Sequence, residues 1–247
     1  MSSLLSHLGQ VGPVTKTVAS SVFALSVLGM LLRFQSPNPE QPAGDEGEPY
    51  YNVYWDLARF LVLKPGMIMS YPWTLLTAGL TETDPLSLIC ALAVFIPCGA
   101  FLERHWGVKQ YAMFLAVAML IPILSTMLLF ILLFALQSDL LYLYKVQING
   151  LASVLIGFAV AFKQISPDHI VKLYRGRISI RCSELPGIIM FVVPPILTLA
   201  KRFPIVVLLH LGFFECWMYL RFFKYDGNVR GDLSETFSFS SFFPEKV

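Results

Sequence analysis

Charged side chains are scarce in this sequence. Only 14% of its 247 residues are Asp, Glu, Lys or Arg, whereas a soluble domain usually carries about 25%. With 56% hydrophobic residues, the chain lacks the polar surface that a water-soluble globule needs. Its formal net charge is only +2, so nucleic acid is not an expected partner. The composition indicates a membrane protein whose surroundings are membrane lipids.

Motifs for metal binding, disulfide bonding and glycosylation are also missing. The four cysteines form no Cys-x-x-Cys pair, so neither a metal site nor a disulfide framework is predicted. No Asn-x-Ser/Thr sequence is present, so N-glycosylation is not expected. The apolar segments lack the paired charges that line an ion path, which argues against a channel or transporter. We expect no cofactor.

Six apolar segments approach the roughly twenty residues that a membrane-spanning helix needs. Their ranges are 17–34, 86–102, 110–136, 148–164, 186–200 and 204–222. They predict an all-α membrane protein, with a six-transmembrane helical bundle over residues 1–224. A short cytosolic tail, 225–247, is expected to follow it.

The segment between the first two spans, 35–85, starts acidic and rich in Pro and Gly and continues with aromatic residues. Trp and Tyr concentrate at membrane–water interfaces, so an interfacial first loop is predicted. The loop 165–185 contains the run VKLYRGRISIRC, which predicts a basic hairpin that either lies near lipid headgroups or docks a partner. Basic loops tend to stay in the cytosol, which places both termini there. Lys201-Arg202 falls on the opposite side and disagrees with this orientation.

Small residues recur along the fourth predicted span at spacings of three and four. Gly150, Ser153, Gly157 and Ala161 would share one helix face, and such a face lets a neighbouring helix approach closely. Helix packing is therefore their default interpretation. Ser153 and His210 of the sixth span lie at similar depth, and a Ser–His pair can support nucleophilic catalysis. An intramembrane serine protease with a Ser153–His210 dyad is the alternative hypothesis.

The run from Trp73 to Gly107, the six spans and the Gly-rich fourth span together resemble the rhomboid fold. The resemblance places Ala152 where active rhomboids carry the nucleophilic serine. It places Ser87 and Ala91 where they carry the His and Asn that help to bind the oxyanion. Only His210 matches a catalytic position. The resemblance therefore implies a pseudoprotease with a rhomboid-like fold and no enzyme activity.

Three further runs are similar to the transmembrane protein 115 family of Golgi-resident rhomboid-like proteins. They are LLYLYKVQINGLASVLIGFAVAFKQ, WMYLRFF and GDLSETFSFSSFFPE. The resemblance implies a Golgi membrane protein that assists vesicle-mediated retrograde transport from the Golgi to the endoplasmic reticulum. It also implies contact with a Golgi tethering complex and a homo-oligomer. The endoplasmic reticulum membrane is the alternative location.

The predicted tail carries four phenylalanines among serines and acidic residues, namely Phe237, Phe239, Phe242 and Phe243. Exposing large apolar side chains to water is unfavourable. These residues either pack against the protein or lipid, or form a docking strip for a partner. Both interpretations stay open at this level.

Overall fold

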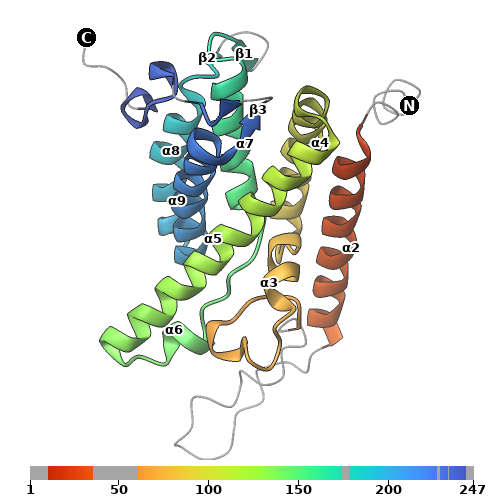
Figure 1. Ribbon diagram of the computed structural model, residues 1–247. Helices are drawn as coiled ribbons and strands as arrows, with labels where there is room; N and C mark the ends of the chain where they lie inside the picture. Colours follow the sequence, from red (N-terminus) through yellow and green to blue (C-terminus); the bar gives the residue numbers. More distant parts are fainter. Residues whose placement is uncertain (1–10, 36–59, 174–177, 227–228, 233, 243–247) are drawn as a thin grey trace, which may run out of the picture.

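The protein is described here by a computed structural model, which covers residues 11–35, 60–173, 178–226, 229–232 and 234–242. The described part is mainly helical (Figure 1). Its long helices are α2 (Pro13–Gln35), α4 (Pro85–Trp106), α5 (Val108–Gln137), α7 (Ala152–Ile165), α8 (Leu185–Leu199) and α9 (Phe203–Met218), the last continuing as a π-helical turn, Tyr219–Phe223. Among the described residues, α2, α4, α5 and α9 with its π turn are long and apolar enough to cross a membrane. Helices α7 and α8 are apolar but shorter.

Short elements connect and flank these helices. They are the 3₁₀ turns Pro65–Met67 and Ala78–Leu80, α3 (Thr74–Thr77), α6 (Leu141–Tyr144), the hairpin of β1 (Ile170–Leu173) and β2 (Ile178–Arg181), the small hairpin of β3 (Tyr225–Asp226) and β4 (Val229–Arg230), and the 3₁₀ turns Glu235–Phe237 and Phe239–Phe242. The β1–β2 pair is antiparallel and lies in the basic loop, as the sequence predicts. Residues 36–59 of the first loop lie outside the described residues.

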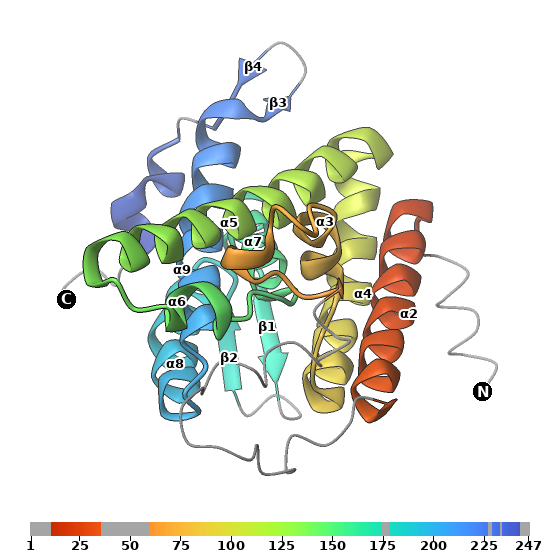
Figure 2. The same ribbon diagram turned by 90° about the horizontal axis from the view of Figure 1, so that it is seen from below.

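Helix α7 is the central element of the bundle. It packs against α4, α5, α8 and α9, and the view along the bundle shows it enclosed by these helices (Figure 2). Nearly every side chain from Ser153 to Ala161 is buried. The core beside it is aromatic, with the rings of Phe95 and Phe158 stacked 5.5 Å apart. Helix α7 is hydrophobic around most of its circumference because protein surrounds it on all sides.

Helix α2 lies at the edge of the bundle and is tied to α4 by Glu103. This carboxylate is only 3% exposed. It accepts backbone N–H bonds from Val14 (3.0 Å) and Thr15 (2.9 Å) and a hydroxyl bond from Thr15 (2.7 Å). The first N–H groups of a helix have no partner within the helix, and its N-terminus carries partial positive charge. The Glu103 carboxylate accepts these N–H groups and places a negative charge at the positive end of the helix, and so it fixes the start of α2.

Helix α7 begins at Ala152, four residues later than the predicted span at 148. Gly150 has a φ of +101°, which an α-helix does not contain. Just before it, Ile148 exchanges two backbone hydrogen bonds with Leu63, at 2.9 and 3.2 Å. Residues 148–151 are apolar enough to be counted in a predicted span, but in the structure they form an extended stretch and a turn before α7.

Candidate functional site

Ser153 and His210, the pair of the alternative hypothesis, are not hydrogen-bonded to each other. Ser153 is 1% exposed, and its hydroxyl has no hydrogen-bond partner among the described residues. His210 is exposed, and its Nδ1 lies 2.7 Å from the carbonyl oxygen of Val206 in the same helix. Gly212 faces Ser153 instead, because a Cβ built on Gly212 would lie 2.7 Å from Ser153 Cα. The dyad that the hypothesis requires is therefore not formed.

Rotation about the axis of α9 explains this difference from the sequence-based expectation. An α-helix turns about 100° per residue, so side chains two positions apart point about 200° away from each other. Gly212 faces Ser153, and His210 precedes Gly212 by two positions, so His210 points to the other side of α9. Equal depth in the two helices is thus not enough to bring the pair together.

A buried glutamate occupies the place where α2, α4 and α7 meet. Glu82 is 6% exposed, and its carboxylate accepts a hydroxyl bond from Ser87 (2.8 Å) and a backbone N–H bond from Leu151 (2.9 Å). The backbone N–H of Glu82 donates to the hydroxyl of Ser26 on α2 (2.8 Å). One residue of the connection before α4 therefore joins three helices. A carboxylate buried in this way needs such donors, because leaving it without them costs several kcal/mol.

Gly150 lets the chain pass directly over this carboxylate. A Cβ built on Gly150 would lie 2.9 Å from Oε1 of Glu82, and the positive φ already disfavours any other residue. Its N–H donates to the carbonyl of Ala78 (2.9 Å), and the neighbouring Asn149 side chain donates to the carbonyl of Thr81 (3.2 Å). Gly150 was expected on the packing face of a helix. The structure instead places it in the turn before α7.

The Glu82 contacts lie beside the position that matters for catalysis in the rhomboid comparison. The resemblance to rhomboids places Ser87 where active members carry an oxyanion-binding histidine, and Leu151 directly precedes Ala152, which it places at the nucleophile position. The hydroxyl of Ser87 and the N–H of Leu151 are donors of the kind that would bind an oxyanion. Both donate to Glu82. Both donors are therefore already engaged by the protein's own carboxylate.

The remaining small residues of the fourth predicted span lie between α7 and α9. Ser153 packs against Gly212, and a Cβ built on Gly157 would lie 2.6 Å from Sγ of Cys216. Ala161, one further turn along, is completely buried. Positions 153, 157 and 161 follow the spacing of one helix face. The two helix backbones approach closely along it because the facing residues are small.

The described tail folds back onto the bundle, so its phenylalanines are not all free to dock a partner. Phe237 and Phe242 are 1% and 4% exposed, whereas Phe239 is 41% exposed. The Phe242 ring lies 5.2 Å from that of Phe213 on α9, and the Phe239 ring lies 5.3 Å from that of Trp217. Phe243 lies outside the described residues. Of the two interpretations left open by the sequence, packing against the protein describes Phe237 and Phe242.

Polar contacts also hold the tail to the bundle, through carbonyl oxygens of the tail. The Trp217 indole donates to the carbonyl of Phe237 (3.2 Å), and the Arg221 guanidinium donates to that of Ser234 (2.6 Å). Lys163 of α7 donates to the carbonyl of Ser241 (2.5 Å) and lies 3.9 Å from the centre of the Phe242 ring. These donors come from α7 and α9, so the tail bridges the two helices.

Asp232 is the tail's ionisable contact with α7. Burial by itself would raise the pKa of its carboxyl, but hydrogen bonds from Ser234 and Gln164 favour the charged form, and the net pKa is lowered. The Gln164 amide lies 3.2 Å from Oδ2, and the Ser234 N–H lies 3.1 Å from Oδ1. The charged Asp232 is therefore the form that joins tail and helix.

Sequence reasoning missed Glu82, Glu103 and Lys163. Each is a charged residue that lies at or near the end of an apolar segment, where a charge is normally read as solvated. Their burial at 6%, 3% and 3% exposure shows that they bind backbone or hydroxyl groups inside the bundle. The sequence does contain one indication of this. A charged residue next to a membrane span is costly to bury, so it is expected to bind a polar group of the protein.

Comparison with known proteins places this architecture in a family. The family model described as "Eukaryotic integral membrane protein (DUF1751)" matches residues 16–247. Transmembrane protein 115 of Bos taurus is 30% identical over 189 residues, covering 75% of this chain and 53% of that protein. Rhomboid-like protein 19 of Arabidopsis thaliana is 30% identical over 194 residues, covering 75% and 60%. The transmembrane protein 115 homolog of Saccharomyces cerevisiae is 25% identical over 210 residues, covering 76% and 61%.

The matched region spans between about half and three fifths of the length of these curated relatives. No solved structure matches the chain. The family model covers nearly the whole sequence, including the bundle and the docked tail. The chain therefore belongs to the DUF1751 family of eukaryotic integral membrane proteins.

Proposed function

We propose that this chain is a rhomboid-like membrane protein without protease activity, which acts as a scaffold or recognition factor. One observation carries the proposal. The carboxylate of Glu82 accepts hydrogen bonds from Ser87 and from the N–H that precedes Ala152. The donors that could stabilise an oxyanion already bind an anion, and a methyl group stands at the nucleophile position.

The energetics of these two bonds oppose substrate hydrolysis. A hydrogen bond to a charged acceptor contributes about 1.5–3 kcal/mol. A substrate carbonyl, which is neutral, would have to displace a buried carboxylate from both donors and leave that charge without its partners. Loss of even one oxyanion donor slows an enzyme by about 10²–10³. The geometry supports binding and packing functions rather than acyl transfer.

We propose that the bundle crosses the membrane six times, with α7 and α8 as the two short crossings. Helix α7 has 14 residues, which corresponds to a length of about 21 Å, less than the hydrocarbon thickness of about 30 Å. It is enclosed by other helices, so irregular backbone at its ends is shielded from lipid. In Figure 1, α2 begins at the end of the bundle where the described tail lies. A chain that crosses the membrane an even number of times begins and ends on the same side, which agrees with this arrangement.

We infer from the same arrangement that both termini face the cytosol. The basic hairpin β1–β2 lies at the end of the bundle where α2 begins and the described tail lies (Figure 1), and positively charged loops stay in the cytosol. Cysteine labelling from either side of sealed vesicles tests this orientation. Single cysteines at Lys109 and Lys145, near opposite ends of α5 and its following turn, should react from opposite sides. Reaction of both from one side would refute it.

The resemblance to Golgi-resident rhomboid-like proteins supports a role in retrograde transport from the Golgi to the endoplasmic reticulum. The test is rescue of retrograde transport in cells that lack the protein. Wild type and the variants Ser153→Ala and His210→Ala should restore transport equally, because neither side chain performs chemistry in this proposal. Failure of both variants, together with cleavage of a membrane substrate by the purified wild type, would support the protease alternative instead. A fluorescent fusion should coincide with a Golgi marker rather than with a marker of the endoplasmic reticulum.

The described tail offers Phe239 as the exposed candidate for contact with a tethering complex or with a second copy of the chain. Phe239→Ala removes a half-exposed ring that also packs against Trp217, so its effect on the melting temperature is measured beside its effect on partners and should be smaller than that of Phe242→Ala. Phe242→Ala serves as the contrast, because it removes a buried ring that holds the tail in place. If docking uses the folded tail, Phe239→Ala should reduce co-purification of partners more than Phe242→Ala does, while lowering the melting temperature less. Unchanged partners in both variants would exclude the tail as the docking surface.

A further inference from the structure

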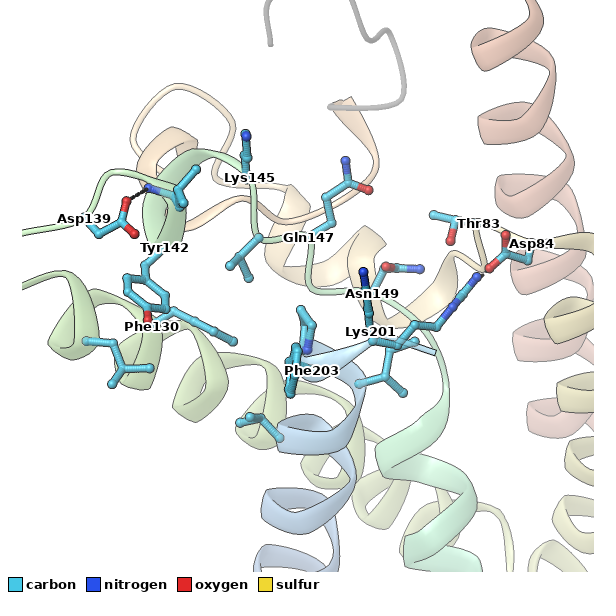
Figure 3. A pocket seen from close by; sticks show the side chains of 17 residues that line it. Thr83, Asp84, Phe130, Asp139, Tyr142, Lys145, Gln147, Asn149, Lys201 and Phe203 are labelled. Carbon is cyan, nitrogen blue, oxygen red and sulfur yellow. Dashed lines mark hydrogen bonds and ion pairs between the residues drawn. The ribbon is translucent and has the colours of Figure 1, made fainter. Parts of the chain in front are cut away.

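A cavity of about 800 Å³ lies at the end of the bundle opposite the described tail. It is enclosed by the last turns of α5, by α6 and by the first turns of α9 (Figure 3). Its walls are mainly apolar, with contributions from Phe130, Leu133, Tyr142, Phe203 and Ile205. The lining does not include Glu82, Ser153 or the tail, although Asn149 and Asp84 lie on the side of the cavity next to the Glu82 turn.

Basic side chains line one side of this cavity. Lys145, Lys201 and Arg202 belong to the lining, together with two acids, Asp84 and Asp139. Figure 3 shows the amino groups of Lys145 and Lys201 extending in the same direction beside the cavity. Three cations against two acids give the lining a formal charge of +1 before the contacts are considered.

Neither of the two acids forms an ion pair with a lysine. Asp84 forms an ion pair with Arg202. Asp139 accepts the backbone N–H of Leu141, the first residue of α6, at 2.9 Å. Lys145 and Lys201 are both exposed, and no ion pair within the described residues involves either of them. Lys145 and Lys201 therefore have no carboxylate partner among the described residues, and the net charge of the lining stays at +1.

The cavity lies at one end of α5, near the level of the lipid headgroups. Helix α5 has 30 residues, which corresponds to a length of about 45 Å and exceeds a hydrocarbon core of about 30 Å. Its terminal turns thus lie near the level of the lipid headgroups. Leu128, Leu132 and Leu136 form an exposed apolar stripe that runs along α5 to this end. The stripe marks the lipid-facing side of α5, on a different face of the helix from Phe130 and Leu133, so this end of α5 and the cavity beside it border the lipid.

We propose that this cavity binds a phosphate-bearing anionic membrane lipid. The headgroup phosphate lies between Lys145 and Lys201, and an acyl chain follows the α5 surface past Phe130 and Leu133. An amphiphile fits both parts of the site, because a soluble anion would leave the apolar walls uncovered and a neutral lipid would leave both charges unpaired. Phosphate accepts strong charge-assisted hydrogen bonds from lysine.

The test measures binding of dioctanoyl phosphatidic acid to the full chain in neutral detergent, by native mass spectrometry and by the rise in melting temperature. Dioctanoylglycerol supplies the same chains without phosphate, and glycerol 3-phosphate supplies the phosphate without chains. We expect phosphatidic acid to bind at least tenfold more tightly than either. Equal binding of glycerol 3-phosphate would show a site for a free anion, and equal binding of dioctanoylglycerol would show a purely apolar site. Either result would overturn the proposal.

Two double variants separate charge from folding. Lys145→Gln with Lys201→Gln should weaken phosphatidic acid binding about tenfold or more, because charged hydrogen bonds to the phosphate are lost. Lys145→Arg with Lys201→Arg retains both charges and should bind within about threefold of wild type. Lys109→Gln, an exposed lysine at the other end of α5, is the control and should bind as wild type does. Undiminished binding by the double Gln variant would refute the assignment of the two lysines.

Discussion

The clearest prediction concerns Glu103, which holds the start of α2 against α4. The substitution Glu103→Gln keeps the shape of the side chain but leaves one oxygen as an acceptor. At least one of the three hydrogen bonds from Val14 and Thr15 is then lost. A hydrogen bond to a charged group contributes about 1.5–3 kcal/mol, and a carboxylate at a partly buried helix N-terminus adds up to about 2 kcal/mol. We expect the free energy of unfolding to fall by about 3 kcal/mol.

Thermal unfolding in detergent, followed by tryptophan fluorescence, measures this effect. A loss of 3 kcal/mol corresponds to a melting temperature lower by about 6–12 °C for a chain of this size. Glu184→Gln is the matched control, since Glu184 precedes α8 as its N-cap, is exposed and makes no side-chain cap hydrogen bond. Hydrogen exchange of the Thr15 amide should accelerate in the first variant alone. Melting temperatures within about 1 °C for wild type and both variants would refute the role of Glu103.

Three further outcomes follow from contacts described above. Gly212→Ala should lower the melting temperature, with a cost of about 1–3 kcal/mol, because its Cβ would lie 2.7 Å from Ser153 Cα. Cys182 should resist a water-soluble maleimide at neutral pH and react only after unfolding, since burial raises the pKa of its thiol and leaves it 2% exposed. The pKa of the Asp232 carboxyl is lowered in the folded protein. Its contribution to holding the tail is therefore present above the unfolded pKa and is lost as the pH falls through the folded pKa. Proteolysis of the tail should accelerate only in acid, and Asp232→Asn should remove this pH dependence.

The positions of the long helices followed from hydropathy. Each of the six apolar segments contains a helix whose boundaries lie within four residues of those predicted. Apolar composition over a sufficient length determines where a chain can be helical in lipid. The β1–β2 hairpin was also predictable, because Arg175-Gly176-Arg177 interrupts two short runs that contain β-branched residues.

Long-range polar contacts were not predictable in this way. Glu82 binds the N–H of Leu151, 69 residues later, and Glu103 binds the N–H of Thr15, 88 residues earlier. Neither partner carries a sequence signal, because the donor is a backbone amide. The opposite directions of His210 and Gly212 around α9 follow from helix geometry, but which of them faces α7 depends on tertiary packing.

The hydrogen bonds of Glu82 make it difficult for a single substitution to give this fold hydrolytic activity. Introducing a hydroxyl nucleophile by Ala152→Ser would leave the neighbouring N–H and the Ser87 hydroxyl bound to the internal carboxylate. Removing Glu82 alone would release these donors but supply no nucleophile, and it would detach the turn at Gly150 that the carboxylate supports. His210 would in addition have to move to the other side of α9. If the chain is inactive, as proposed, each of these single changes costs stability or supplies only part of a catalytic site, so activity would require several coupled changes.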